Sequence, residues 1–196
     1  MKIITFAHQK GGVGKSTLTI NIAYYLHSIG KDVAVLDMDY QGSSWSCLKG
    51  IPVYRKGEAL NEHDYVLIDT PPYNSSEMQE LFEDSDIVVI PTKAGLVDLI
   101  AISSTIKIFD KARAKKEELC GFVVFNMIDQ RNTIFEEILP KFEALGLPVL
   151  KKSIHHRASF IRSVTEDLGI FSLKDKIAQE EIINLTKEIL NYGSKI

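Results

Sequence analysis

The segment from Lys10 to Thr17 reads KGGVGKST and follows the apolar run 3–7 after only two residues, His8 and Gln9. A strand that feeds a glycine-rich turn ending in Gly-Lys-Ser is typical of a phosphate-binding loop. Its glycines tolerate positive φ angles, so successive backbone N–H groups can point at one anion. We expect Lys15 to neutralise the β- and γ-phosphates of a nucleotide and the Ser16 hydroxyl to ligate Mg²⁺. The residues predicted to bind the nucleotide in this loop are Lys10, Gly11, Gly12, Val13, Gly14, Lys15, Ser16 and Thr17.

This loop departs from the general phosphate-binding pattern at its start. Gln9 stands where the pattern has a glycine, and a second lysine, Lys10, lies just inside the loop. The backbone of the loop already fills the space beside its own phosphates, so Lys10 is better placed to reach a nucleotide in a facing subunit. A solvated surface lysine is the alternative.

Carboxylates follow two other apolar runs of the chain. Asp37 and Asp39 come after the run 32–36, and Asp69 follows Tyr65–Ile68 and precedes two prolines. Because the carboxyl ends of parallel strands carry the site in open α/β sheets, these side chains are expected near the phosphate-binding loop. One of Asp37 and Asp39 could support the metal while the other orients the attacking water. Asp69 is the candidate for a magnesium-associated carboxylate.

Apolar runs of strand length alternate with helical patterns along the chain, which predicts one doubly wound α/β domain over residues 1–196 with a mostly parallel sheet flanked by helices. The predicted strands are Lys2–Ala7, Asp32–Leu36, Tyr65–Ile68, Asp86–Ile90, Cys120–Phe125 and a short Pro148–Leu150. The predicted helices are Lys15–Ser28, Ser76–Phe82, Asp98–Ala114, Thr133–Leu145 and Asp175–Asn191.

The composition favours an intracellular globular protein. A length of 196 residues suits one domain with a sizeable core, and 45% hydrophobic and 25% charged residues are ordinary values. The two cysteines, Cys47 and Cys120, have no metal-binding spacing and are expected to be reduced. The net charge of −3 means that any nucleic-acid binding requires a local basic patch.

Taken together, Lys10–Thr17, Asp37–Gly42 and Asp69–Pro72 resemble the motifs of the deviant Walker-A P-loop ATPases of the ParA/MinD superfamily, which are P-loop NTPases of the SIMIBI type. The likeness spans essentially the whole chain and is strongest to small ParA partition ATPases such as ParF. One departure is Tyr40, where the family usually has proline after its catalytic aspartate.

The resemblance implies a weak ATPase that uses ATP and Mg²⁺ and forms a nucleotide-sandwich homodimer. Lys10 would cross to the partner's ATP, Lys15 and Ser16 would serve their own site, and Asp39 would position the hydrolytic water. Asp69 would be the magnesium-associated carboxylate, with Asp37 as a second metal candidate. Asn126 matches a position that often contacts adenine; a cap at the end of a strand is the alternative.

The resemblance also implies binding to nonspecific DNA, a cytoplasmic, nucleoid-associated location, and a small centromere-binding partner of the ParB or ParG type. The candidate DNA contacts are Lys151, Lys152, Arg157 and Arg162, in a basic segment that Lys174 and Lys176 follow. A solvated basic surface is the alternative. A second basic cluster at residues 111–116 ends a predicted helix, where positive charge already favours the helix dipole.

Other members of the superfamily provide competing functions. A MinD-like membrane ATPase would end in a basic amphipathic helix, but the segment 175–191 has an acidic polar face and is expected to pack on the domain rather than on a membrane. An iron–sulfur scaffold would need a bridging cysteine pair that Cys47 and Cys120 do not supply. A metabolic synthetase of the dethiobiotin-synthetase type does not require Lys10. Conjugative transfer of DNA or positioning of a large cellular cargo would use the same machinery and stays open.

Overall fold

The computed structural model describes residues 1–39, 48–72, 75–129, 135–166 and 169–193. In these residues six strands form one parallel sheet with the order β3-β2-β4-β1-β5-β6. The strands are β1 (Lys2–Phe6), β2 (Val33–Asp37), β3 (Val53–Arg55), β4 (Tyr65–Asp69), β5 (Ile87–Thr92) and β6 (Cys120–Phe125).

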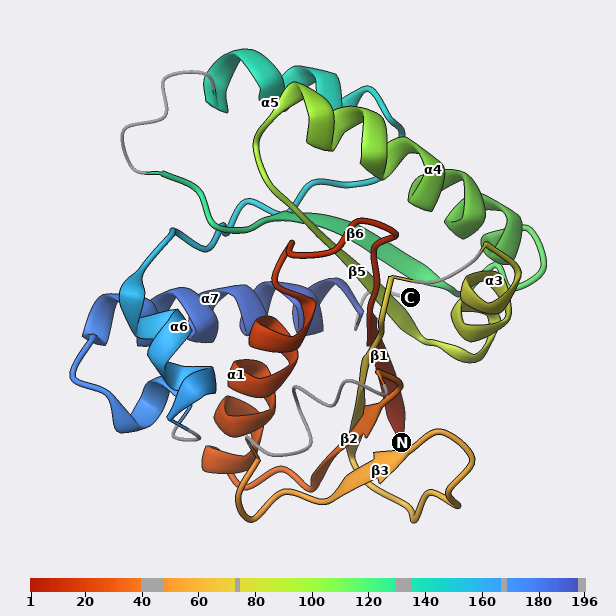
Figure 1. Ribbon diagram of the computed structural model, residues 1–196. Helices are drawn as coiled ribbons and strands as arrows, with labels where there is room; N and C mark the ends of the chain where they lie inside the picture. Colours follow the sequence, from red (N-terminus) through yellow and green to blue (C-terminus); the bar gives the residue numbers. More distant parts are fainter. Residues whose placement is uncertain (40–47, 73–74, 130–134, 167–168, 194–196) are drawn as a thin grey trace.

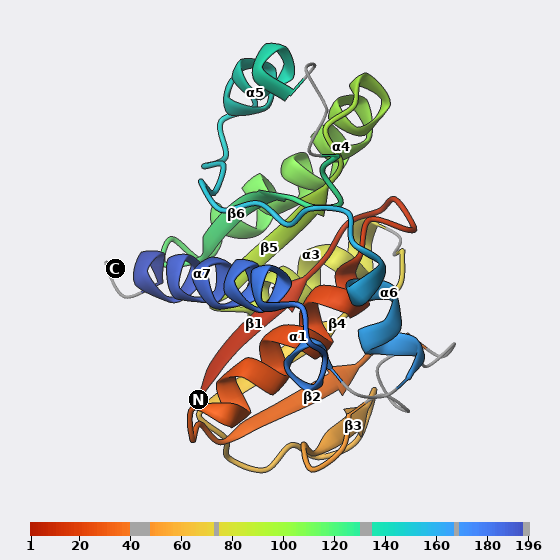
Figure 2. The ribbon, with the colours of Figure 1, turned by 90° about the vertical axis from the view of Figure 1, so that its left-hand side faces the viewer.

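Helices cover both faces of this sheet (Figure 1). Their bounds are α1 (Lys15–Ser28), α3 (Ser75–Asp84), α4 (Leu96–Arg113), α5 (Phe135–Glu143), α6 (Ala158–Thr165), the 3-10 turn η1 (Ile170–Ser172) and α7 (Lys176–Tyr192). Helices α1, α6 and α7 lie on one face, which Figure 2 views, and α3, α4 and α5 lie on the other. Two apolar cores result because successive strand residues point to opposite faces: Val89 joins the core under α1 and α7, while Val88 and Ile90 join the core under α3 and α4.

The predicted doubly wound α/β fold is confirmed, and most predicted elements are present within a few residues of their expected ends. The strand prediction for Pro148–Leu150 is wrong. Only Val149 forms a bridge there, to Val123, and Val123 N–H donates to the Pro148 carbonyl. Pro148 has no N–H with which to extend the ladder. The predicted start of the fourth helix, Thr133, lies outside the described residues, as does Cys47.

Three elements were not predicted from the sequence: β3, α6 and the three-residue turn η1. The edge strand β3 is three residues long and has no buried residue, so it leaves no apolar run. Helix α6 is eight residues long and begins without a side-chain cap, so neither its length nor its start gives a helix signal.

A buried asparagine fixes α6 and η1 against α1. Asn21 Nδ2 donates to the Thr17 carbonyl at 2.8 Å and to Ser163 Oγ at 3.1 Å, and Ile170 N–H donates to Asn21 Oδ1 at 2.7 Å. Asn21 and Ser163 are fully buried. Because buried polar groups are costly to leave without partners, this network holds α6 close to the first turn of α1.

Helix α7 packs on the domain, as its acidic polar face predicted. Asp175 caps its N-terminus by accepting a hydrogen bond from Ala178 N–H at 3.1 Å, and Ile182, Leu185 and Ile189 are buried on the core under α1. No helix in the described part of the chain is long and apolar enough to cross a membrane.

Candidate functional site

Three strands bring the predicted site residues to one edge of the sheet. Phe6 of β1 is in register with Asp69 of β4, and Asp69 is in register with Asp37 of β2. The Thr70 hydroxyl, one residue beyond β4, donates to the Phe6 carbonyl at 2.9 Å. The start of the glycine-rich loop and both buried carboxylates therefore lie together at the carboxyl ends of neighbouring strands, as the sequence predicted.

The loop has the backbone of a phosphate cradle. Gly12 and Gly14 have φ angles of 71° and 89°, which side chains rarely adopt. Gly14 is the N-cap of α1 and no side chain caps that helix start. A Cβ atom at Gly11 or Gly12 would meet nothing within 4 Å, so open space lies directly in front of this backbone. Together with the positive end of α1, this open turn can accept an anion.

Asn126 holds the glycine-rich loop from the end of β6. Its Nδ2 donates to the Val13 carbonyl at 2.7 Å, and its Oδ1 accepts from Met127 N–H at 3.0 Å. A Cβ atom at Gly14 would collide with the Asn126 amide, so this close approach requires glycine. The predicted adenine contact of Asn126 stays a prediction, and the structure adds a loop-positioning contact that the sequence did not indicate.

An open cavity of about 320 Å³ lies in front of the loop. Asp39 is on its wall. The residues of the predicted nucleotide site that line it are Gly11, Gly12, Gly14, Lys15, Ser16 and Thr17. Lys15 is buried and its ammonium lies 3.4 Å from the His8 carbonyl. Burial lowers the Lys15 pKa, and the carboxylates of Asp69 and Asp39 oppose that shift.

A second cavity, of about 280 Å³, adjoins the first and shares Thr17, Met127 and Val164 with it. Its wall also carries Asn126 and, from α6, the buried Phe160. An aromatic and aliphatic wall beside a phosphate cradle has the chemistry of a site for a flat heterocycle. Of this pocket, the sequence indicated Thr17 and Asn126 as nucleotide contacts, and not the aromatic wall.

The acidic groups at this edge suit Mg²⁺ bound together with phosphates. Asp37 and Asp69 are buried, and Asp37 Oδ1 accepts a hydrogen bond from Asp39 N–H at 2.9 Å, which ties Asp39 to the end of β2. Among the described residues, no group of three or more His, Cys, Asp or Glu side chains could cage a metal by itself. Mg²⁺ typically takes one or two carboxylates plus substrate phosphates, and the hydroxyl of Ser16 completes such a donor set. Tyr40 and Gly42 lie outside the described residues.

Lys10 does not point into the cavity that Lys15 serves. Its ammonium lies 2.7 Å from Asp98 Oδ1 in the first turn of α4, and its backbone N–H donates to His8 Nδ1 at 2.7 Å. The side chain of Lys10 is 34% exposed, whereas that of Asp98 is 10% exposed. The two lysines of the motif therefore have different environments within one chain.

His8 was missed by the sequence analysis, although it lies at the centre of this arrangement. It is fully buried, and its carbonyl and ring contact Lys15 and Lys10 respectively. Burial, assisted by the positive charge of Lys15, lowers the His8 pKa from 6.5 to about 4. The imidazole is therefore neutral at physiological pH and accepts the Lys10 N–H through Nδ1. Its position just before the motif was the only signal in the sequence.

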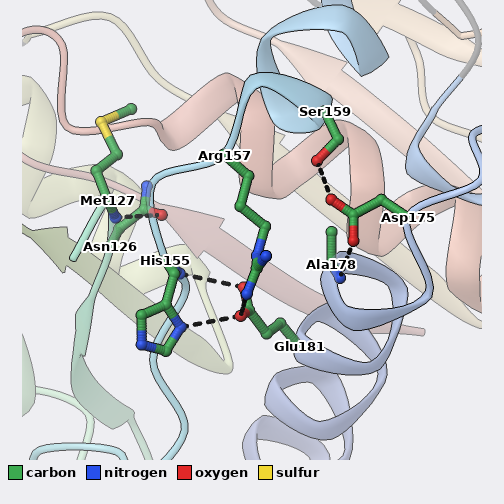
Figure 3. A network of polar contacts seen from close by, with 8 residues as sticks. All are labelled: Asn126, Met127, His155, Arg157, Ser159, Asp175, Ala178 and Glu181. Carbon is green, nitrogen blue, oxygen red and sulfur yellow. Dashed lines mark hydrogen bonds and ion pairs between the residues drawn. The ribbon is translucent and has the colours of Figure 1, made fainter. Parts of the chain in front are cut away.

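The four predicted DNA contacts fall into different environments. Lys151, Lys152 and Arg162 are exposed. Arg157 is half-buried, and its guanidinium donates to Glu181 Oε1 at 3.0 Å, an oxygen that also lies 2.9 Å from His155 Nδ1 (Figure 3). Arg157 thus helps to join the segment before α6 to α7.

Comparison with known proteins gives a family match over most of the chain. The family model for the CobQ/CobB/MinD/ParA nucleotide binding domain matches residues 4–170. Maintenance of carboxysome distribution protein A from Halothiobacillus neapolitanus is 28% identical over 207 residues, covering 95% of this chain and 95% of that protein. The chromosome-partitioning ATPase Soj from Treponema pallidum is 28% identical over 214 residues, covering 100% of this chain and 80% of that protein.

Solved structures with low sequence identity share the fold. Apo McdA from Cyanothece superimposes with a TM-score of 0.78 at 14% identity, covering 97% of this chain and 99% of that chain. MinD from Pyrococcus horikoshii, complexed with Mg-ADP, superimposes with a TM-score of 0.72 at 16% identity, covering 96% of this chain and 95% of that chain.

The buried neutral His8 makes a testable contribution to stability. Unfolded His8 takes up a proton below about pH 6.5, whereas folded His8 does so only near pH 4, so the unfolded state binds more protons in this window. The free energy of unfolding should therefore fall as the pH decreases through it. A pKa shift of this size corresponds to a loss of about 3 kcal/mol in the free energy of unfolding across this pH window. Urea unfolding of the wild type and His8→Asn at several pH values isolates the effect, and identical pH slopes would contradict it.

Proposed function

Because the chain belongs to the CobQ/CobB/MinD/ParA family of nucleotide-binding domains, we propose that it is a DNA-partition ATPase that switches between a monomer and an ATP-bridged homodimer. The observation that carries this proposal is that the two lysines of the loop lie in different places. Lys15 lines the phosphate cavity, while Lys10 lies outside it on the same loop. A lysine that lies on this loop but outside its own cavity would be available to a nucleotide in a facing subunit.

ATP fits the two adjoining cavities by its chemistry. The triphosphate would occupy the cavity in front of the loop, where Lys15 and the N–H groups at the start of α1 meet its negative charge. The adenine would lie in the second cavity, between Thr17 and Phe160. Mg²⁺ would be held by Ser16, Asp37 and Asp69, and would neutralise phosphate charge. The solved Mg-ADP complex of a MinD protein with this fold supports the choice of cofactors.

Asp39 is proposed to orient and activate the attacking water. It lies on the cavity wall, and its backbone is fixed by the hydrogen bond to Asp37. A carboxylate held there can accept a proton from water while Lys15 stabilises negative charge that develops on the phosphates.

The proposed DNA face centres on a basic hollow between α6 and the start of α7. This hollow has a volume of about 750 Å³ and is lined in part by the exposed cations Arg162, Lys174 and Lys176. Lys151 and Lys152 are exposed as well, whereas Arg157 is committed to Glu181. We therefore place the phosphate contacts on Arg162 and the lysines, and give Arg157 a structural role. A dimer would align two such faces along one duplex.

The proposed cargo is a DNA molecule, recruited through a small centromere-binding protein of the ParB or ParG type. The likeness to the chromosome-partitioning ATPase Soj supports this role. A nucleoid-associated location would follow from the proposed binding to DNA. The finer likeness to ParF-type proteins rests on the sequence motifs alone. A protein compartment as cargo is the second candidate, because the Halothiobacillus relative is named for carboxysome distribution. The same dimer and DNA face would serve either cargo.

Replacing Asp39 tests the chemistry. Asp39→Ala should bind ATP and dimerise but hydrolyse ATP roughly 10²–10⁴-fold more slowly, the usual contribution of general acid–base assistance. Phosphate release and ATP-dependent dimerisation are measured on the same preparation. Wild-type turnover in this variant would assign the water to another group, with Asp37 the next candidate.

Replacing Lys10 tests the dimer. Lys10→Ala should bind ADP almost normally, because Lys10 lies outside the cavity of its own chain, but should stay monomeric with Mg-ATP. Sedimentation velocity is run beside Lys107→Ala, an exposed lysine on α4, and Lys15→Ala, which should lose nucleotide binding altogether. An ATP-dependent dimer of Lys10→Ala would refute the sandwich arrangement.

Charge reversal tests the DNA face. Arg162→Glu with Lys174→Glu and Lys176→Glu should abolish ATP-dependent binding to arbitrary duplex DNA and spare dimerisation. Milder variants, in which one cation at a time becomes alanine, should reduce the steepness of the log–log salt dependence by ~0.9 for each phosphate that is no longer neutralised. The variant Lys151→Glu with Lys152→Glu tests separately whether the two lysines outside the hollow contribute to DNA binding.

Lys107→Glu with Lys111→Glu, on α4, is the matched control and should bind DNA normally. Anionic liposomes are tested in parallel. Binding of the ATP-bound protein to liposomes, without binding to DNA at low salt, would indicate a MinD-like membrane function instead.

A further inference from the structure

Lys10 is held at both ends by buried groups of its own chain. Its backbone N–H donates to the ring of His8, and its ammonium forms a 2.7 Å ion pair with Asp98 Oδ1. His8 is 0% exposed and Asp98 is 7% exposed. A flexible lysine at the surface of a loop would not need two buried partners. The arrangement therefore fixes where the ammonium lies when the chain is alone.

Asp98 is a mostly buried residue at the start of α4. It lies in the first turn of α4, where Leu99 N–H donates to the carbonyl of Gly95, the N-cap of the helix. A Cβ atom at Gly95 would lie 2.8 Å from Asp98 Oδ2, closer than such atoms approach one another, so the carboxylate fills the space that a side chain at residue 95 would take. The carboxylate is therefore mostly buried at the start of α4, where the Lys10 ammonium reaches it.

We propose that Asp98 is a positioning residue that retains the Lys10 ammonium on its own chain until a facing subunit presents ATP. This inference rests on the proposed sandwich dimer and adds its regulation. To reach the partner's phosphates, Lys10 must leave a buried carboxylate, which opposes association. The triphosphate of ATP carries more negative charge than the diphosphate of ADP and competes better for the ammonium. Asp98 would therefore make dimerisation depend on the third phosphate, because ADP carries too little negative charge to draw Lys10 away from the carboxylate.

Removing the Asp98 charge should make dimerisation easier. With a non-hydrolysable ATP analogue and Mg²⁺, Asp98→Asn should lower the dimer dissociation constant about tenfold, because a charge-assisted hydrogen bond no longer has to be broken. Asp110→Asn, which removes an exposed carboxylate from the same helix, is the matched control and should match the wild type. If Asp98→Asn does not fold, Asp98→Ser replaces it, and the same decrease in the dimer dissociation constant is expected.

A double-mutant cycle distinguishes retention of Lys10 from a structural role of Asp98 in α4. In the Lys10→Ala background, Asp98→Asn should leave the dimer dissociation constant unchanged, because there is no ammonium to retain. An equal effect of Asp98→Asn in both backgrounds would mean that the carboxylate acts only through helix stability, and would overturn the proposal.

The monomer provides a readout that does not depend on dimerisation. With ADP, acetylation of Lys10 by an N-hydroxysuccinimide ester should be several-fold faster in Asp98→Asn than in the wild type, with the exposed Lys107 as internal reference in mass spectrometry. Equal rates would overturn the proposal. If the wild type dimerises with ATP and Asp98→Asn dimerises no better, the inference alone fails. A wild type that stays monomeric with ATP would refute the sandwich and the inference together.

Discussion

The parallel register of three strands is the constraint on which the site depends. Because β1, β4 and β2 pair in parallel, Phe6, Asp69 and Asp37 are lateral neighbours, and the segments that follow them leave the sheet at one edge. A slip of one residue in any pair would turn Asp37 or Asp69 to the opposite face of the sheet and separate it from the glycine-rich loop. The chemistry of the site is thus fixed by hydrogen bonds between strands before any ligand is present.

Electrostatics at this edge favours a polyanion. Burial lowers the pKa of Lys15 and keeps His8 neutral. The positive charge of Lys15 is therefore unfavourable inside the loop unless an anion is bound beside it. Lys10, in contrast, is already compensated by Asp98. A bound polyphosphate would neutralise the buried charge of Lys15 directly. For Lys10 it would have to compete with the carboxylate of Asp98. The two lysines of one short motif would therefore respond differently to the proposed nucleotide, because only Lys10 already has a carboxylate partner in an ion pair.

The sequence predicted what depends on local pattern and failed where tertiary contacts decide. The buried strands, α1 and the loop were predicted because apolar runs and glycines leave direct signals. Helix α6 was missed because Asn21 and Ser163 fix a segment too short to be recognised by itself. The pairing of Lys10 with Asp98 joins residues 88 positions apart in the chain. For Arg157, which the sequence predicts as a DNA contact, the half-buried ion pair with Glu181 could not be foreseen, because it depends on the packing of α7.

Helix α6 lies between the second cavity and the basic hollow. Phe160 and Val164 face the second cavity, while Ser159 and Arg162 line the hollow beside α7. Ser159 donates to Asp175, the N-cap of α7, at 2.6 Å, so the two helices are joined at the hollow (Figure 3). Because Phe160, Val164 and Arg162 belong to one short helix, a displacement of α6 would move the wall of the second cavity and Arg162 together.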